Sequence, residues 1–326
     1  MKNILLINTG GTIGSREENG VISSENGKCR ILELYKKAFP DTQIEFTTVM
    51  PYNILSENLE TAHWEMLINY IISLDKSRYD GIIITHGSDT LSYTSAMLGM
   101  CLHDMGLPVV ITASDHVPDH PESNALANFT ACVKLINCCH NGVYTVYKNK
   151  DEPSAQAFIP TRIMEADRFN DKFTHINGII GYDSPTDLLR AFPSAGKNSL
   201  DIKTLHLSKN VLLLHSYPSI KLETITPDDN TGAVMLVTYH SGTVPEKAEI
   251  LLEKCLAKKL PLFLCSLKRS SEALYETSSR LLEKGALPIY DMTTEGAYAK
   301  LLLAVNLCPE NILEFMRKDI YYETLC

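Results

Sequence analysis

The sequence predicts an α/β protein of two domains, each built on a parallel sheet, with the larger domain at the amino end. The chain has 326 residues, more than one hydrophobic core comfortably holds. Short apolar runs alternate with longer helical patterns, as expected for parallel strands joined by helices. The alternation stops in a polar, irregular stretch at 192–208 and then resumes. We therefore expect domains at 1–195 and 209–326, joined by a linker at 196–208.

The first half contains short apolar runs separated by segments with apolar residues at three-to-four spacing, which is typical of helices. The expected strands are 3–8, 43–48, 81–85, 108–112 and 142–147. The expected helices are 60–74, 91–105 and 122–139. In such a sheet, functional residues gather where the carboxyl ends of the strands meet loops and helices.

The second half repeats this alternation on a smaller scale. Pro245 suits the first turn of a helix, and Gly285 suits the end of another. The expected strands are 211–215, 233–239 and 261–265. The expected helices are 245–259, 270–284, 293–306 and 309–318.

Composition narrows the class of protein. Hydrophobic residues make up 44% and charged residues 21% of the chain, which is ordinary for a soluble globular protein. A net charge of −9 without a basic run argues against nucleic acid or an anionic membrane as a partner. The apolar run 3–8 is far shorter than the ~20 residues of a membrane span. It leads directly into a glycine turn that looks functional, so we expect a cytoplasmic protein without a cleaved signal.

The cysteines and histidines give no sign of a cofactor. The nine cysteines are odd in number and form no CxxC pair, which favours free thiols in a reducing compartment. His116 and His120 have no obvious third ligand near them. We therefore expect neither a metal nor a cofactor.

A glycine turn, TGGTIG at 9–14, follows the first expected strand. Its glycines allow a tight turn that presents backbone N–H groups. A threonine hydroxyl there could attack a carbonyl if a base stood nearby. The turn lacks the glycine spacing and the lysine of nucleotide-binding loops. Taken alone, the motif fits a functional turn and an ordinary strand-to-loop turn equally well.

A second motif, THGSDT at 85–90, begins at the last residue of the third expected strand and precedes a helical pattern. Ser88 and Asp89 would place a hydroxyl and a carboxylate beside the backbone donors of a helix start. Taken alone, such a pair is more often a helix cap without chemistry. His86 in the same motif is expected to be structural rather than a base.

Together the two motifs resemble the two signatures of the bacterial-type L-asparaginases, TGGTI and HG(T/S)DT. The segments LSENL at 55–59, YPSI at 217–220 and DMTTE at 291–295 are also similar to family segments, the last two to those of cytoplasmic (type I) members. The resemblance implies the two-domain α/β fold, with the catalytic motifs in the amino-terminal domain. It also implies an amidohydrolase that converts L-asparagine to L-aspartate and ammonia.

The resemblance assigns catalytic roles to four residues. Thr12 would be the nucleophile that forms an acyl-enzyme, and Ser88 would lie beside the scissile amide. Asp89 would hold the α-amino group of the substrate. Arg162 stands where the family has a lysine that helps to activate a hydroxyl. Because arginine cannot take up a proton near neutral pH, it would act only through its charge.

The resemblance also implies a set of substrate-binding residues. Ser56 would bind the α-carboxylate of the substrate, with Glu57 alongside. Backbone N–H groups of Gly11 and Ala113, together with that of Ser88, would stabilise negative charge. A small amino-acid amide is the implied substrate, and a homodimer or homotetramer is the implied assembly.

Several family positions differ in this chain. Serine replaces threonine at 88, valine stands at 21 where the family has a tyrosine, and the turn 239–243 lacks an asparagine that many members supply to a neighbouring subunit. These changes leave three functions open. The first is a slow asparaginase. The second is an enzyme that acts on glutamine or a β-aspartyl compound, or gives its amide nitrogen to a partner transferase. The third is a binding or regulatory protein with an impaired site.

Overall fold

The computed structural model describes residues 2–18, 21–23, 30–138, 141–177, 179–180, 198–267 and 273–324. The chain divides into two compact units, Met1–Leu205 and His206–Cys326, each with its own sheet. The predicted α/β class with parallel sheets is confirmed. Residues 196–197 of the expected linker lie outside the described residues.

The first unit contains a sheet in the order β4-β1-β5-β6-β7-β8-β9, parallel from β4 to β7 and antiparallel beyond. The strands β5, β6 and β7 are buried at every position, as continuous apolar runs require when helices cover both faces of a sheet. The strands of this sheet are β1 (Lys2–Asn8), β4 (Ile44–Val49), β5 (Gly81–Thr85), β6 (Pro108–Thr112), β7 (Gly142–Tyr147), β8 (Gln156–Phe158) and β9 (Ile179–Ile180).

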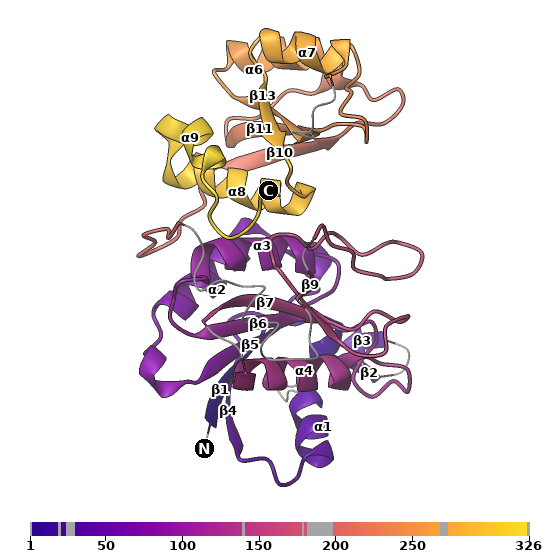
Figure 1. Cartoon of the computed structure of the whole chain (residues 1–326), viewed down its shortest axis with the longest axis vertical. Coiled ribbons are helices and arrows are strands. Elements are labelled where there is room, and N and C mark those ends of the chain that lie inside the picture. The colour runs from indigo at the N-terminus through magenta and orange to yellow at the C-terminus, as the bar shows by residue number, and fades with distance from the viewer. Residues whose placement is uncertain are drawn as a thin grey trace. The chain divides into compact units, whose positions relative to one another are not determined.

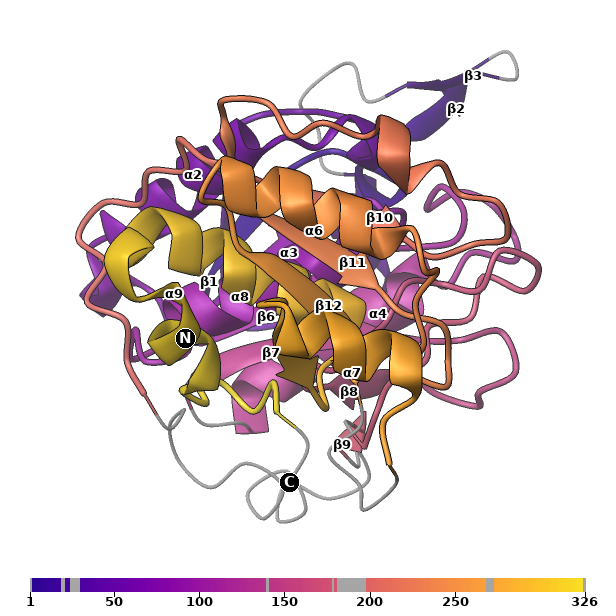
Figure 2. The ribbon, with the colours of Figure 1, turned by 90° about the horizontal axis from the view of Figure 1, so that it is seen from above.

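Helices cover both faces of this sheet. The helices α2 (Thr61–Ile72) and α3 (Leu91–Leu102) lie on one face, and α1 (Arg30–Ala38) and α4 (Ala125–Cys138) lie on the other (Figure 1). The strands β2 (Arg16–Glu18) and β3 (Val21–Ser23) form a short antiparallel hairpin at the rim of the unit (Figure 2). This hairpin follows the glycine turn at the end of β1.

The expected strands of the first half match β1, β4, β5, β6 and β7 to within one residue at each end. Helix α1 and the short strands β8 and β9 were not expected. The strands β8 and β9 have three and two residues, too few to show an alternating pattern, and α1 has nine.

The second unit has a parallel sheet in the order β10-β11-β12-β13. The helices α6 and α7 lie on one face of this sheet and α8 on the other (Figure 1). The strands are β10 (Asn210–His215), β11 (Thr231–Val237), β12 (Leu262–Leu267) and β13 (Leu287–Tyr290). The helices are α6 (Ala248–Ala257), α7 (Glu276–Glu283), α8 (Thr294–Leu307) and α9 (Ile312–Arg317).

The sequence did not predict β13, whose short LPIY pattern contains a proline. Residues 270–272 of the expected helix 270–284 lie outside the described residues. No helix within the described ranges is long and apolar enough to cross a lipid bilayer.

Candidate active site

The glycine turn after β1 contacts the turn after β5 directly. Gly10 and Gly11 have φ angles of 102° and 71°, a region that favours glycine. A Cβ atom on Gly11 would lie 2.4 Å from both Cα and N of Gly87. A Cβ atom on Gly10 would lie 2.2 Å from the carbonyl oxygen of Ile54. Only residues without side chains allow these backbones to approach so closely.

Backbone hydrogen bonds join the same segments. The N–H of Thr9 donates to the carbonyl of Thr85 at 3.1 Å, and the N–H of Ile54 donates to the carbonyl of Thr9 at 3.2 Å. The N–H of Gly11 donates to the carbonyl of Ile54 at 3.0 Å. Because β1 and β5 are parallel neighbours, both motifs meet at the carboxyl edge of the sheet, where the segment at 54–56 joins them.

Ser56 connects this segment to the second motif. Its side chain is buried, and its hydroxyl donates to Oδ2 of Asp89 at 3.5 Å. The Thr90 hydroxyl donates to the carbonyl of Ser56 at 3.0 Å. Glu57 follows in the short η2 turn (Ser56–Asn58) and is exposed. The structure thus places the residues expected to bind the α-carboxylate and the α-amino group of a substrate side by side.

Thr12 begins the short η1 turn (Thr12–Gly14) and is half-buried. Its carbonyl accepts a hydrogen bond from the N–H of Ser15 at 3.1 Å, and the Ser15 hydroxyl donates to the carbonyl of Gly11 at 2.7 Å. These bonds hold the turn that carries Thr12. Its role as nucleophile stays a prediction.

His86 is a structural residue at neutral pH. Its Nδ1 lies 2.8 Å from the carbonyl of Gly87 and therefore carries the proton, and its Nε2 accepts from the Thr94 hydroxyl at 3.1 Å. Thr94 in turn accepts from Nε1 of Trp64 at 2.9 Å. Burial lowers the pKa of His86 to about 4, so the ring is neutral and fixes the turn before Ser88.

A cavity of about 390 Å³ opens beside Ser88 and Asp89, a size that suits a small molecule. Three of its wall residues follow or end neighbouring strands: Ser88 after β5, Asp115 after β6 and Tyr147 at the end of β7. Apart from Asp89, the remaining lining residues come from one segment of the chain. They are Glu165, Ala166, Asp167, Arg168, Asp171 and Phe173.

That segment is a hairpin-like arm at 162–176. Its two sides are joined by a bridge between Ile163 and His175 and by a hydrogen bond from the N–H of Met164 to the carbonyl of Thr174 at 2.9 Å. Arg162 lies at the base of the arm, half-buried, and its guanidinium donates to the carbonyl of Asn177 at 3.2 Å. Arg162 is not among the residues that line the described cavity; the guanidinium in its wall belongs to Arg168.

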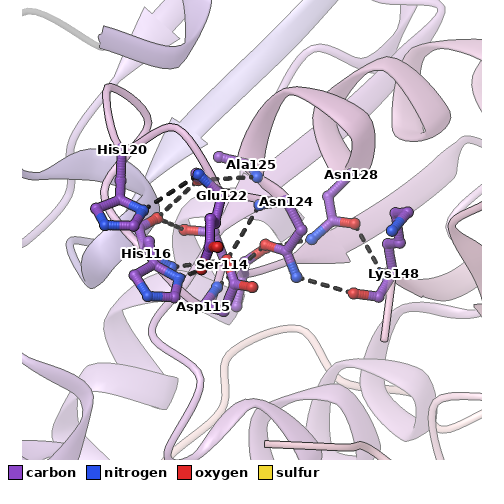
Figure 3. A network of polar contacts seen from close by, with 11 residues as sticks. Ser114, Asp115, His116, His120, Glu122, Asn124, Ala125, Asn128 and Lys148 are labelled. Carbon is purple, nitrogen blue, oxygen red and sulfur yellow. Dashed lines mark hydrogen bonds and ion pairs between the residues drawn. The ribbon is translucent and has the colours of Figure 1, made fainter. Parts of the chain in front are cut away.

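Ala113 directly follows β6 and is fully buried. Its carbonyl accepts a hydrogen bond from Nδ2 of Asn128 in α4 at 2.9 Å. Asp115 lies two residues further on, in a polar network with Asn124 that Figure 3 shows.

Of Val21 the structure describes only the backbone, and Asn19 and Gly20 lie outside the described residues.

Sequence reasoning missed several residues of the cavity, above all Asp115, Tyr147 and Arg168. The rule that ligands bind at the carboxyl ends of parallel strands would have pointed to Asp115 and Tyr147, because both stand there. No comparable signal marks Arg168. Within the described part of the chain, no group of three histidine, cysteine or acidic residues is arranged to hold a metal ion.

A family model described as "Asparaginase, N-terminal" matches residues 3–176, the segment that carries both motifs and the cavity. Among curated proteins, a glutamyl-tRNA(Gln) amidotransferase subunit from Aeropyrum pernix is 25% identical over 97% of this chain and 77% of its own length. The corresponding protein of Pyrococcus horikoshii is 26% identical over 93% of this chain and 72% of its own length.

Solved structures of asparaginases share the fold. The thermostable L-asparaginase from Thermococcus kodakarensis has a TM-score of 0.80 and 26% sequence identity, and 99% of each chain is covered. L-asparaginase I from Vibrio cholerae has a TM-score of 0.75 and 23% identity, and covers 100% of this chain and 99% of its own. The second likeness supports the fold alone.

Proposed function

This chain belongs to the asparaginase family, and we propose that it hydrolyses the side-chain amide of a small amino acid and releases ammonia. One observation carries the proposal. The turn that bears Thr12, the segment that bears Ser56 and the turn that bears Ser88 and Asp89 contact one another through Gly11 and Gly87. The cavity beside Ser88 and Asp89 gives a small substrate room to bind.

In the proposed reaction, the hydroxyl oxygen of Thr12 attacks the amide carbon, and the backbone N–H groups of Ser88 and Ala113 stabilise the negative charge on the amide oxygen. The N–H of Gly11, which the family resemblance also assigned to this role, donates instead to the carbonyl of Ile54. The hydroxyl proton passes through Ser88 to the amide nitrogen, the carbon–nitrogen bond breaks, and ammonia leaves. Water then cleaves the ester at Thr12 and frees the acid. Asp89 holds the ammonium group of the substrate.

Neither Arg162 nor Arg168 can accept a proton near neutral pH, because a guanidinium remains charged. In the proposal, Arg162 contributes only a fixed positive charge. Hydrolysis is therefore slow, since losing a positioned proton acceptor typically costs ~10²–10⁴-fold in rate.

A second candidate function keeps the chemistry and changes the fate of the nitrogen. It is favoured by the curated relatives named above, components of glutamyl-tRNA(Gln) amidotransferases that match more than nine-tenths of this chain. In this candidate, the chain releases ammonia from asparagine or glutamine for a partner protein that uses it. We also propose that the chain assembles as a homodimer or homotetramer.

Ammonia release from purified protein tests both candidates. Asparagine and glutamine are supplied at saturating concentration, and Thr12→Ala serves as the inactive control. Turnover of either amide by wild type alone supports the proposed chemistry. Measurable turnover that increases when a partner transferase is added favours the second candidate. Equal background release by wild type and Thr12→Ala contradicts both.

A further inference from the structure

The cavity beside Ser88 carries far more negative than positive charge. Among the described residues of its wall, one carries a guanidinium, that of Arg168. Against it stand the carboxylates of Asp89, Asp115, Glu165, Asp167 and Asp171. A cleft lined by one sign of charge concentrates ions of the opposite sign. The wall of this cavity therefore favours a cationic group over an anionic one.

One of these carboxylates, that of Asp115, is held in place by hydrogen bonds to the backbone. Its Oδ1 accepts hydrogen bonds from the N–H of His116 at 2.8 Å and from the N–H of Asn124 at 3.0 Å (Figure 3). Its own N–H donates to Oδ1 of Asn124 at 3.1 Å. Asn124 is buried, and its Nδ2 donates to the carbonyl of Lys148 at 2.9 Å. This network fixes the rotation of the Asp115 side chain.

The second carboxylate oxygen of Asp115 has a different environment. Every hydrogen bond and ion pair that the carboxylate of Asp115 makes with described side chains or backbone uses Oδ1, including the contact with Nδ1 of His116 at 3.3 Å. The side chain is 17% exposed and lines the cavity. Oδ2 is therefore free to accept a hydrogen bond from a molecule in the cavity.

Folding of the loop does not require the charge of Asp115. An asparagine at 115 could accept the same two backbone hydrogen bonds through its Oδ1. The other neighbour in the cavity wall, Tyr147, adds no charge, because burial raises its pKa to about 12. A fixed carboxylate that the fold does not need is suited to bind an ammonium group, since little ordering is lost on binding.

We propose that Asp115 acts with Asp89 to select amide substrates that carry an ammonium group and have their α-carboxyl group masked, so that their net charge is positive. This inference rests on the proposed function. Asp89 binds the ammonium group, and Asp115 presents a second negative charge beside it. A free α-carboxylate would meet like charge at this wall, whereas an α-carboxyl group masked as an amide would not. Free asparagine remains a substrate but is used less efficiently.

Three compounds of different charge test this inference: the α-N-methylamide of L-asparagine, L-asparagine itself and N-acetyl-L-asparagine. The methylamide releases ammonia only from its side chain, and it is cationic at pH 6.5, below the usual pKa of an α-amino group. The measurement is kcat/KM for ammonia release. We expect wild type to prefer the methylamide, then asparagine, then the acetylated compound.

The variant Asp115→Asn keeps the backbone hydrogen bonds and removes the charge. It should lower the preference for the methylamide over asparagine by about ten- to hundredfold, the range of a hydrogen bond to a charged group. Glu122→Gln is the matched control. It removes one carboxylate from the same loop, outside the wall of this cavity, and should leave the preference unchanged.

A second variant keeps the inference testable if Asp115→Asn does not fold. Asp171→Asn removes another exposed carboxylate of the wall, at a φ of 55° that asparagine tolerates. It should shift the preference in the same direction by a smaller factor. An unchanged preference in a folded Asp115→Asn protein would overturn the inference.

The experiment gives a different result if the proposed hydrolysis does not occur at all. If wild type releases ammonia from none of the three compounds, the proposed hydrolysis is wrong. Calorimetric titration with the methylamide then decides the role of Asp115 separately. Binding to wild type that weakens about tenfold or more in Asp115→Asn supports it, and equal binding or none contradicts it.

Discussion

The Ser56 hydroxyl lies 3.5 Å from Oδ2 of Asp89 and links two segments that are far apart in the sequence. Ser56 is buried against Gly87, where a Cβ atom would lie 2.3 Å from its Oγ. This arrangement fixes the hydroxyl beside the carboxylate expected to bind the substrate's ammonium group. It therefore makes Ser56 the first residue to test for substrate binding.

Ser56→Ala should raise KM for asparagine about tenfold and leave kcat within about threefold. The hydroxyl contributes to binding in the ground state and in the transition state alike, so its loss weakens both equally. Ser73→Ala, which removes an exposed hydroxyl bonded to the carbonyl of Tyr70, is the control. An unchanged KM in Ser56→Ala would show that the Ser56 hydroxyl does not contribute to substrate binding.

Arg162→Lys should raise kcat about tenfold or more, because a lysine amine can exchange a proton and a guanidinium cannot. Arg168→Lys is the matched variant, since Arg168 lines the cavity whereas Arg162 bonds the carbonyl of Asn177. A gain in Arg168→Lys alone would transfer the expected role from Arg162 to Arg168. No gain in either variant would mean that the hydroxyl is activated by a route without an amine.

The neutral state of His86 makes stability depend on pH. Its pKa is about 4 in the folded protein and near 6.5 when unfolded, so the unfolded chain binds the proton more tightly. The stability that His86 contributes is fully present above pH 6.5 and is lost as the pH falls toward 4. The loss amounts to about 3 kcal/mol.

The check is urea unfolding at pH 7 and pH 5 for wild type and His86→Gln. The free energy of unfolding should fall more between these pH values in wild type than in the variant. If the free energy of unfolding falls equally in wild type and in His86→Gln, another group causes the acid sensitivity.

In the second unit, Lys300 and Glu323 form a fully buried ion pair at 2.6 Å. The carboxylate also accepts hydrogen bonds from the N–H groups of Ile320 and Tyr321. Glu323→Gln leaves a buried ammonium without its counter-charge and should destabilise the protein by about 3–5 kcal/mol. Glu314→Gln, in the exposed pair with Lys318, should cost less than about 1 kcal/mol. Similar midpoints of urea unfolding for the two variants would show that the buried ion pair contributes no more to stability than the exposed one.

The parallel core was predictable because its strands are continuous apolar runs with distinct ends, as in β5 and β6. The strand β13 was not, since it is short and contains Pro288. The motif residues Ser88 and Asp89 stand in consecutive positions that the sequence displays directly. Asp115 is oriented by Asn124, nine residues later, and this pairing leaves no local pattern.

Arg168 is the clearest case of a residue that sequence reasoning could not place. It reaches the cavity because the arm at 162–176 folds back on itself through the bridge between Ile163 and His175. The family pattern directed attention to Arg162, at the base of the same arm. Long-range pairing of this kind depends on the folded chain rather than on residue type.

If Thr12 is the nucleophile of an amide hydrolase, its side chain carries an acyl group during turnover. The most direct measurement is mass spectrometry of the intact protein, quenched in acid during turnover of asparagine or glutamine, with Thr12→Ala alongside. We expect a wild-type species heavier by one acyl group, with the added mass on the peptide that contains Thr12, and ammonia release that Thr12→Ala lacks. Ammonia release that persists in Thr12→Ala, or an acyl group carried by Ser88, would show that Thr12 is not the nucleophile.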